Sequence, residues 1–213
     1  MASIFGHALA AIALGTSFKK NTQGQPPEQT DEVIKESDLK TIKVKSKTFK
    51  SRLVSKKFWI LGAICAMLPD ADVIGFQFGI KYQSLWGHRG FSHSIVFALL
   101  LGIAVTLFFY RKSFGTREGW LYIFFFTLCT ISHGVLDALT NGGLGVAFFA
   151  PFDTTRYFFP WRPIQVSPIG ASKFFSHWGL KVIFSELIWI GIPAGLYILS
   201  TFTLKKIFSE KQE

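Results

Sequence analysis

Apolar runs separated by short polar connections account for most of the chain. They cover residues 1–18, 58–80, 95–110, 120–139 and 180–204. A helix that crosses a membrane needs about 20 predominantly apolar residues, a length that the second, fourth and fifth runs reach. The first run is shorter, and we expect it to form a short helix packed against the others. The pattern predicts an all-α integral membrane bundle of about four or five hydrophobic helices.

Composition favours a membrane protein over a soluble helical bundle, the competing fold. In this chain of 213 residues, hydrophobic residues make up 49%, Phe alone occurs 24 times, and the mean hydropathy is +0.34. A soluble bundle of this size seldom has such long unbroken apolar and aromatic runs. Cys65 and Cys129 both lie inside apolar runs. This placement predicts small buried hydrophobic side chains rather than a disulfide framework.

The net charge of +10 predicts how the helices are oriented. Short cytoplasmic loops of membrane proteins carry an excess of Lys and Arg, so we place 19–57, 111–118 and the C-terminal tail in the cytoplasm. The N-terminus and the connections 81–92 and 140–179 then lie on the opposite side. We interpret 19–57 as a flexible, basic cytoplasmic insertion. Contact of its later part with anionic lipid or nucleic acid is the less favoured alternative, and we expect no nucleic-acid partner.

Ionisable side chains interrupt the apolar runs at a few points. Asp70 and Asp72 interrupt the second run, and His133 and Asp137 lie near the end of the fourth. Residues i and i+4 of a helix share one face, so His133 and Asp137 can reach a common ligand. A charged group inside a membrane helix is costly without a partner. These four residues therefore mark a candidate functional site.

The predicted topology brings the ionisable residues to one depth. At about 1.5 Å per helical residue, Asp70 and His133 lie roughly 20 Å from the cytoplasmic ends of their helices. Asp137 lies one turn further out. Three histidines are predicted at the same outer level, one in the first helix and two before the third: His7, His88 and His93. This convergence predicts a shared site rather than separate packing contacts.

The residue types indicate a metal centre. His and Asp without cysteine at chelating spacing suit zinc, manganese or iron. Six residues are the predicted ligands: His7, Asp70, His88, His93, His133 and Asp137. Two ions that share a bridging carboxylate would use such a set, and paired ions suit phosphoester hydrolysis.

Three residues have predicted roles beside the ligands. Asp72 is either a further ligand or a carboxylate that fixes a histidine tautomer. A general base is expected at Asp70 or Asp72. Arg89 is placed to pair with a phosphate or a carboxylate, and we expect it to steady a substrate phosphate.

Four motifs carry a resemblance to a known family. They are Gly6-His7, Leu68-Pro69-Asp70-Ala71-Asp72, His88-Arg89-Gly90-Phe91-Ser92-His93-Ser94 and Ser132-His133-Gly134-Val135-Leu136-Asp137. In order and spacing, over nearly the whole chain except 19–57, they resemble the YdjM-type membrane-bound metal-dependent hydrolases. The resemblance implies a single hydrolase domain over 1–213 in a bacterial or archaeal cytoplasmic membrane. The site pattern is also similar to zinc-dependent phospholipase C and P1 nuclease, which implies one to three zinc ions and phosphoester chemistry.

The favoured function is hydrolysis of a phospholipid or another amphiphilic phosphoester by metal-activated water. The site is expected to open toward the extracytoplasmic side, with membrane lipid as both environment and candidate substrate. The alternative is a divalent-metal or ion transporter that uses the same His and Asp residues. Because the polar residues gather on one side of the bilayer, the enzyme is favoured. A third alternative is a structural metal, with the 19–57 insertion docking an acidic protein partner.

Overall fold

The computed structural model describes residues 1–18, 55–169 and 174–210. Within these ranges the regular secondary structure is helical, apart from two isolated β-bridges. The α-helices are α1 (Ile4–Phe18), α2 (Lys56–Met67), α3 (Ile95–Phe109), α4 (Arg117–Ala138), α6 (His177–Glu186) and α7 (Ile192–Glu210). Shorter elements are the 3-10 helices η2 (Leu68–Phe78), η3 (Phe91–His93) and η4 (Arg111–Ser113), and the π-helical turn η5 (Leu187–Gly191). The all-α prediction is confirmed.

Three helical stretches of the described chain are long and apolar enough to cross a membrane: Lys56–Phe78, Arg117–Ala138 and His177–Phe208. The other two apolar helices, α1 and α3, are shorter. At about 1.5 Å per residue, a helix of this shorter kind covers less than the roughly 30 Å hydrocarbon core. The fold is therefore a bundle of five apolar helical stretches, within the predicted range.

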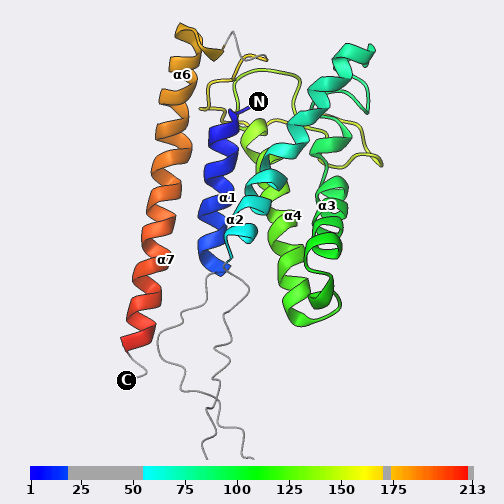
Figure 1. Ribbon diagram of the computed structural model, residues 1–213. Helices are drawn as coiled ribbons and strands as arrows, with labels where there is room; N and C mark the ends of the chain where they lie inside the picture. Colours follow the sequence, from blue (N-terminus) through cyan, green and yellow to red (C-terminus); the bar gives the residue numbers. More distant parts are fainter. Residues whose placement is uncertain (19–54, 170–173, 211–213) are drawn as a thin grey trace, which may run out of the picture.

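The helices alternate in direction and lie side by side (Figure 1). The N-terminus, the start of α6 and the connections around η3 and 140–169 lie at one end, which we call the loop end. At the opposite end lie the start of α2, the η4 turn and the C-terminal part of α7. Basic residues gather at this second end, which we call the basic end: Lys56, Lys57, Arg111, Lys112, Arg117, Lys205 and Lys206. Most of the predicted 19–57 insertion lies outside the described residues.

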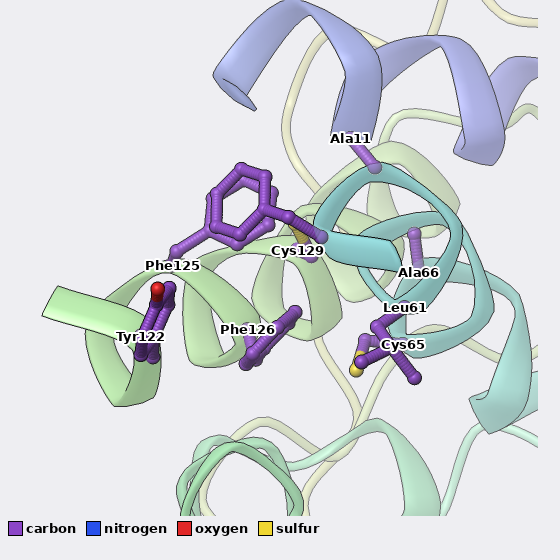
Figure 2. Close-up of a cluster of buried hydrophobic side chains, with 9 residues drawn as sticks. Ala11, Leu61, Cys65, Ala66, Tyr122, Phe125, Phe126 and Cys129 are labelled. Carbon is purple, nitrogen blue, oxygen red and sulfur yellow. The ribbon is translucent and has the colours of Figure 1, made fainter. Parts of the chain in front are cut away.

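A buried aromatic cluster holds α1, α2 and α4 together (Figure 2). The rings of Phe58 and Phe125 stack with their centroids 4.1 Å apart, and Ala11 of α1 packs against the same cluster. Cys65 and Cys129 are unpaired and almost fully buried within it. The interpretation of both cysteines as small hydrophobic side chains is confirmed.

The second apolar run changes helix type where the sequence has its proline. The α-helix α2 ends at Met67, and the 3-10 helix η2 begins at Leu68 with Pro69 in its first turn. Proline has no N–H to donate to the preceding turn, so it favours a break at this point. The break turns Asp70 away from the regular helical path and buries it.

Two helices begin earlier than predicted because polar side chains cap them. The side chain of Thr116 accepts a hydrogen bond from Gly119 N–H, so α4 begins at Arg117 rather than at residue 120. Ser55 caps α2 in the same way, and residues 56–57, predicted as loop, are helical. A capping hydroxyl satisfies one of the four free N–H groups of the first turn, which stabilises the earlier start.

The last apolar run is one long helix interrupted by a π-helical turn. Its start at His177, rather than the predicted 180, follows capping by Ser176. Pro193, which cannot donate a backbone hydrogen bond, lies two residues after the wide turn η5. Glu186 in this helix is buried against the N-terminal segment.

Candidate metal centre

Three helical elements meet at the loop end and bring two aspartates and two histidines together. Donor atoms of Asp70, His93, His133 and Asp137 all lie within 4.8 Å of one another, and all four residues are buried. We call these four residues the His/Asp cluster. The η2 helix supplies Asp70, η3 supplies His93, and the last turns of α4 supply His133 and Asp137.

The two histidines point the same ring nitrogen into the cluster. His133 Nε2 lies 3.3 Å from Asp70 Oδ1, and His93 Nε2 lies 3.6 Å from Asp137 Oδ2. The two Nε2 atoms are 3.0 Å apart. Two facing nitrogen lone pairs repel each other unless a proton or a cation lies between them. The geometry therefore fits a positively charged species at the centre of the cluster.

Hydrogen bonds on the far side of His133 fix its tautomer. His133 Nδ1 lies 2.7 Å from the carbonyl oxygen of Ala66. A carbonyl oxygen only accepts, so Nδ1 carries the proton and donates it. In a neutral imidazole, the Nε2 lone pair is then free for a metal ion.

The carboxylate of Asp72 contacts both histidines of the 88–93 motif. Its Oδ1 lies 2.7 Å from His88 Nδ1, and its Oδ2 lies 3.3 Å from His93 Nδ1. Ser92 Oγ donates to Asp72 Oδ2 and lies 2.9 Å from His93 Nδ1. Of the two predicted roles for Asp72, these contacts fit the carboxylate that orients histidines. Asp72, His88 and His93 also lie close enough together to form a second potential ligand group.

The surroundings shift the pKa values of the two histidines in opposite directions. Burial lowers the pKa of His88, and the hydrogen bond to Asp72 only partly offsets it. Burial also acts to lower the pKa of His93, but the neighbouring carboxylates of Asp137, Asp70 and Asp72 outweigh it and raise the pKa to about 10. His88 is thus neutral at pH 7. Without a metal, His93 is protonated and balances part of the carboxylate charge.

His7 lies against the cluster without joining its hydrogen bonds. Its ring stacks on that of His133 with centroids 3.7 Å apart, and its Nε2 lies 3.6 Å from Asp137 Oδ1. Both ring nitrogens of His7 and both oxygens of Asp70 are buried without a hydrogen-bond partner among the described residues. Buried polar atoms without partners are rare and costly. A metal ion would satisfy them, so these residues fit the group that the sequence predicts.

The charge balance of the site also fits a cation. Three carboxylates gather here, those of Asp70, Asp72 and Asp137, and they face the side chain of Arg89 and the N-terminal ammonium of Met1, 3.9 Å from Asp137 Oδ1. Placing several carboxylates in a poorly solvated region is unfavourable unless opposite charge compensates them. Protonation of His93 supplies part of that compensation, and a divalent ion would supply more.

Arg89 differs from its predicted role. Its guanidinium is fully buried, and its three nitrogens donate to Asp137 Oδ2 at 2.9 Å, Thr140 Oγ1 at 2.9 Å and the carbonyl of Gly142 at 2.8 Å. Of the two partners left open by the sequence, the structure shows the carboxylate. The expectation that Arg89 steadies a substrate phosphate is not supported, because no donor nitrogen is left exposed to reach one.

Local backbone geometry makes room for this arginine. Gly143 has φ +91°, a conformation that residues with a Cβ rarely adopt, and a Cβ there would lie 2.5 Å from Arg89 Nη1. Arg89 itself has φ 64°. Non-glycine residues in this region are uncommon and are held by their surroundings, here the three hydrogen bonds of the guanidinium.

Several contacts of the site could not be expected from the motifs. Ala2 N–H donates to Asp137 Oδ1 at 2.7 Å, and Ser3 binds the carboxylate of Glu186 through both its N–H and its hydroxyl. Ser94 caps α3, whereas Ser92 contacts Asp72 and His93. His177, interpreted as part of a loop, begins α6 and lies outside both potential ligand groups.

Comparisons with known proteins agree with the fold and the motifs. The sequence model described as YdjM inner membrane protein matches residues 1–208. The chain is also 40% identical over 148 residues to the inner membrane protein YbcI of Escherichia coli (strain K12), which covers 68% of this chain and 83% of that protein. No solved structure matches. The resemblance drawn from the four motifs is confirmed, and the chain belongs to the YdjM inner membrane protein family.

Proposed function

We propose that this protein is a membrane-bound, metal-dependent hydrolase that acts on a phospholipid or another amphiphilic phosphoester. The ligands would come from His7, Asp70, His88, His93, His133 and Asp137, with zinc as the favoured ion and one to three ions bound. The observation that carries the proposal is the buried His/Asp cluster, with its facing Nε2 atoms and the unpartnered oxygens of Asp70. Its position at one end of apolar helices favours an amphiphilic substrate.

A divalent ion held by these residues would supply Lewis acidity and would lower the pKa of a water molecule, so that hydroxide is available as the nucleophile near neutral pH. The chain's own carboxylates would handle the proton. Asp70 suits a general base because its oxygens have no hydrogen-bond partner in the described chain. Asp72 suits it less, since His88, Ser92 and the N–H of Arg89 already occupy its oxygens. Asp72 would instead orient the histidines, and Arg89 would hold Asp137.

The proposed orientation places the cluster toward the extracytoplasmic side of the inner membrane. The cluster and the basic end lie at opposite ends of the bundle (Figure 1). Since basic loops favour the cytoplasm, the loop end would face outward. A lipid of the outer leaflet would then present its headgroup at the level of the cluster.

Metal content of the purified protein tests the proposal most directly. We expect divalent metal in the wild type, and loss of metal and of phosphoesterase activity in His133→Ala and Asp137→Asn. The matched controls His177→Ala and Asp153→Asn, outside both ligand groups, should keep both. Full metal occupancy in a His133→Ala/Asp137→Asn double variant would refute the metal centre. Metal flux into proteoliposomes without phosphoester hydrolysis would favour the transporter instead.

A further inference from the structure

An apolar groove runs between α1 and the start of the last helix. It has a volume of about 350 Å³, within the range of roughly 300–1,000 Å³ that is usual for small-molecule sites. Its lining comes from two segments: Phe5, Gly6 and Leu9 of α1, and Ile183, Glu186, Leu187, Ile190 and Gly191 of α6 and η5. One lining residue, Glu186, is charged.

One wall of the groove belongs to the least buried of the three stretches of the described chain that are long enough to cross a membrane. Only 22% of the apolar window of His177–Phe208 is buried inside the protein, against 44% for Lys56–Phe78 and 56% for Arg117–Ala138. Phe5 and Leu187, on the two walls, are 70% and 60% exposed. In Figure 1, the last helix flanks α1 on the outside of the bundle. Acyl chains of the bilayer are therefore the surroundings into which the groove opens.

Two local features of the backbone shape the groove. The π-helical turn η5 forms part of one wall. Such turns are rare and are found most often at functional sites. Gly6 forms part of the other wall, and a Cβ there would lie 2.9 Å from Ile190 Cδ1. A larger residue at position 6 would therefore fill space in the part of the groove nearest the loop end.

A short chain of contacts lies between the loop-end side of the groove and the His/Asp cluster, none of whose four residues lines the groove. Glu186 binds Ser3, and the neighbouring Ala2 donates its N–H to Asp137. Gly6 directly precedes His7, whose ring stacks on His133. At about 1.5 Å per residue, Asp137 lies roughly 30 Å from the first residue of α4, and Glu186 lies roughly 36 Å from the last residue of α7. The groove thus begins at the level of the cluster.

From that level the groove runs into the membrane. Leu9 in α1 and Ile190 in η5 both lie further toward the basic end than Gly6 and Glu186, because both helices run from the loop end. A ligand that filled the groove would have its apolar part among Leu9, Leu187 and Ile190 and its polar part beside the cluster. An amphiphile with one polar end matches this order.

We propose that the groove binds an acyl chain of a membrane phospholipid whose phosphate headgroup reaches the His/Asp cluster. The substrate would enter sideways from the bilayer, between α1 and the last helix. This inference rests on the proposed function, since the cluster supplies the chemistry at the headgroup. It further assigns to the groove the selection of a lipid over a water-soluble phosphoester.

Photo-crosslinking in proteoliposomes tests the groove without relying on activity. The probe is phosphatidylethanolamine with a diazirine on one acyl chain, used at increasing mole fraction. Labelling of the groove peptides should saturate, whereas labelling of bulk lipid contacts should rise linearly. Leu187→Trp should reduce the saturable labelling at least fivefold. Leu199→Trp, at a similarly exposed position of the same helix outside the groove, should change it less than twofold.

Hydrolysis assays separate failure of the groove from failure of the proposed function. Leu187→Trp should lower kcat/KM for a long-chain phospholipid at least tenfold, with metal content and hydrolysis of its dihexanoyl analogue unchanged. Equal loss on both substrates, or labelling of the groove that never saturates, would overturn the groove while leaving the hydrolase intact. Saturable labelling without any hydrolysis would support the groove and reject the hydrolase. Crosslinks from the groove to a second copy of the chain would overturn the lipid assignment.

Discussion

At the scale of single residues, Arg89 is the clearest case of a side chain whose role depends on burial. Its guanidinium binds Asp137, Thr140 and Gly142 and is fully buried. Removing one partner of a buried ion pair leaves an uncompensated charge, a loss of about 3–5 kcal/mol. Arg89→Ala should therefore lower the free energy of unfolding by about this amount, measured by thermal unfolding in detergent. The exposed Arg162→Ala serves as the control.

The alternative role for Arg89 makes the opposite prediction. If the guanidinium steadied a substrate phosphate, Arg89→Ala would raise KM for a phosphoester and leave the unfolding temperature close to that of Arg162→Ala. Arg89→Lys refines the comparison, because one ammonium cannot reproduce the planar fork that reaches three partners. We expect Arg89→Lys to be destabilised as well.

His93 gives the site a predictable pH dependence. The neighbouring carboxylates of Asp137, Asp70 and Asp72 hold its pKa at about 10 against the effect of burial, so below that pH His93 is protonated in the metal-free protein. A metal ion that binds its Nε2 must displace this proton, and acid therefore opposes binding. The apparent association constant should rise about tenfold per pH unit between about pH 7 and 9, measured by competition with a chelating dye. A pH-independent constant over that range would remove His93 from the ligand set.

At the scale of helices, α3 and α4 depend on a close approach at Gly102. A Cβ at this position would lie 2.8 Å from the carbonyl oxygen of Ile123 in α4, a backbone atom that cannot move aside. Gly102→Ala should push the helices apart and lower the free energy of unfolding by about 1–3 kcal/mol. Gly195→Ala in α7 meets nothing within 4 Å, and its better helix propensity should stabilise the protein by up to about 1 kcal/mol. Thermal unfolding of both variants in detergent makes the comparison, and equal effects would show that this contact is unimportant.

The helices also show which features a sequence can predict here. Run length and basic loops were enough to place Asp70, His133 and Asp137 at one level, because a helix advances by a constant rise per residue. The 88–93 connection could be predicted only as a segment near that level. The pairing of Arg89 with Asp137, and of Ser3 with Glu186, depends on how loops fold back across sequence separations of 48 and 183 residues. Motif spacing contains no information about such contacts.

At the scale of the whole molecule, charge is distributed unevenly between the two ends of the bundle. Lys and Arg gather at the basic end, whereas the buried carboxylates lie at the loop end. This separation serves two purposes in the proposed reading. Under the proposed function, the basic residues would anchor the orientation at the cytoplasmic surface, and the carboxylates would hold cations on the other side.

Cysteine labelling measures that orientation directly. The two native cysteines are almost fully buried, so the wild type should give little background. Phe152, 88% exposed at the loop end, and Lys112, exposed in the η4 turn at the basic end, provide the two positions. A membrane-impermeant maleimide should label Phe152→Cys in cells whose outer membrane has been opened and whose inner membrane is intact. Lys112→Cys should react only after the inner membrane is permeabilised. The reverse pattern would place the His/Asp cluster on the cytoplasmic side, where a lipid substrate would have to come from the inner leaflet.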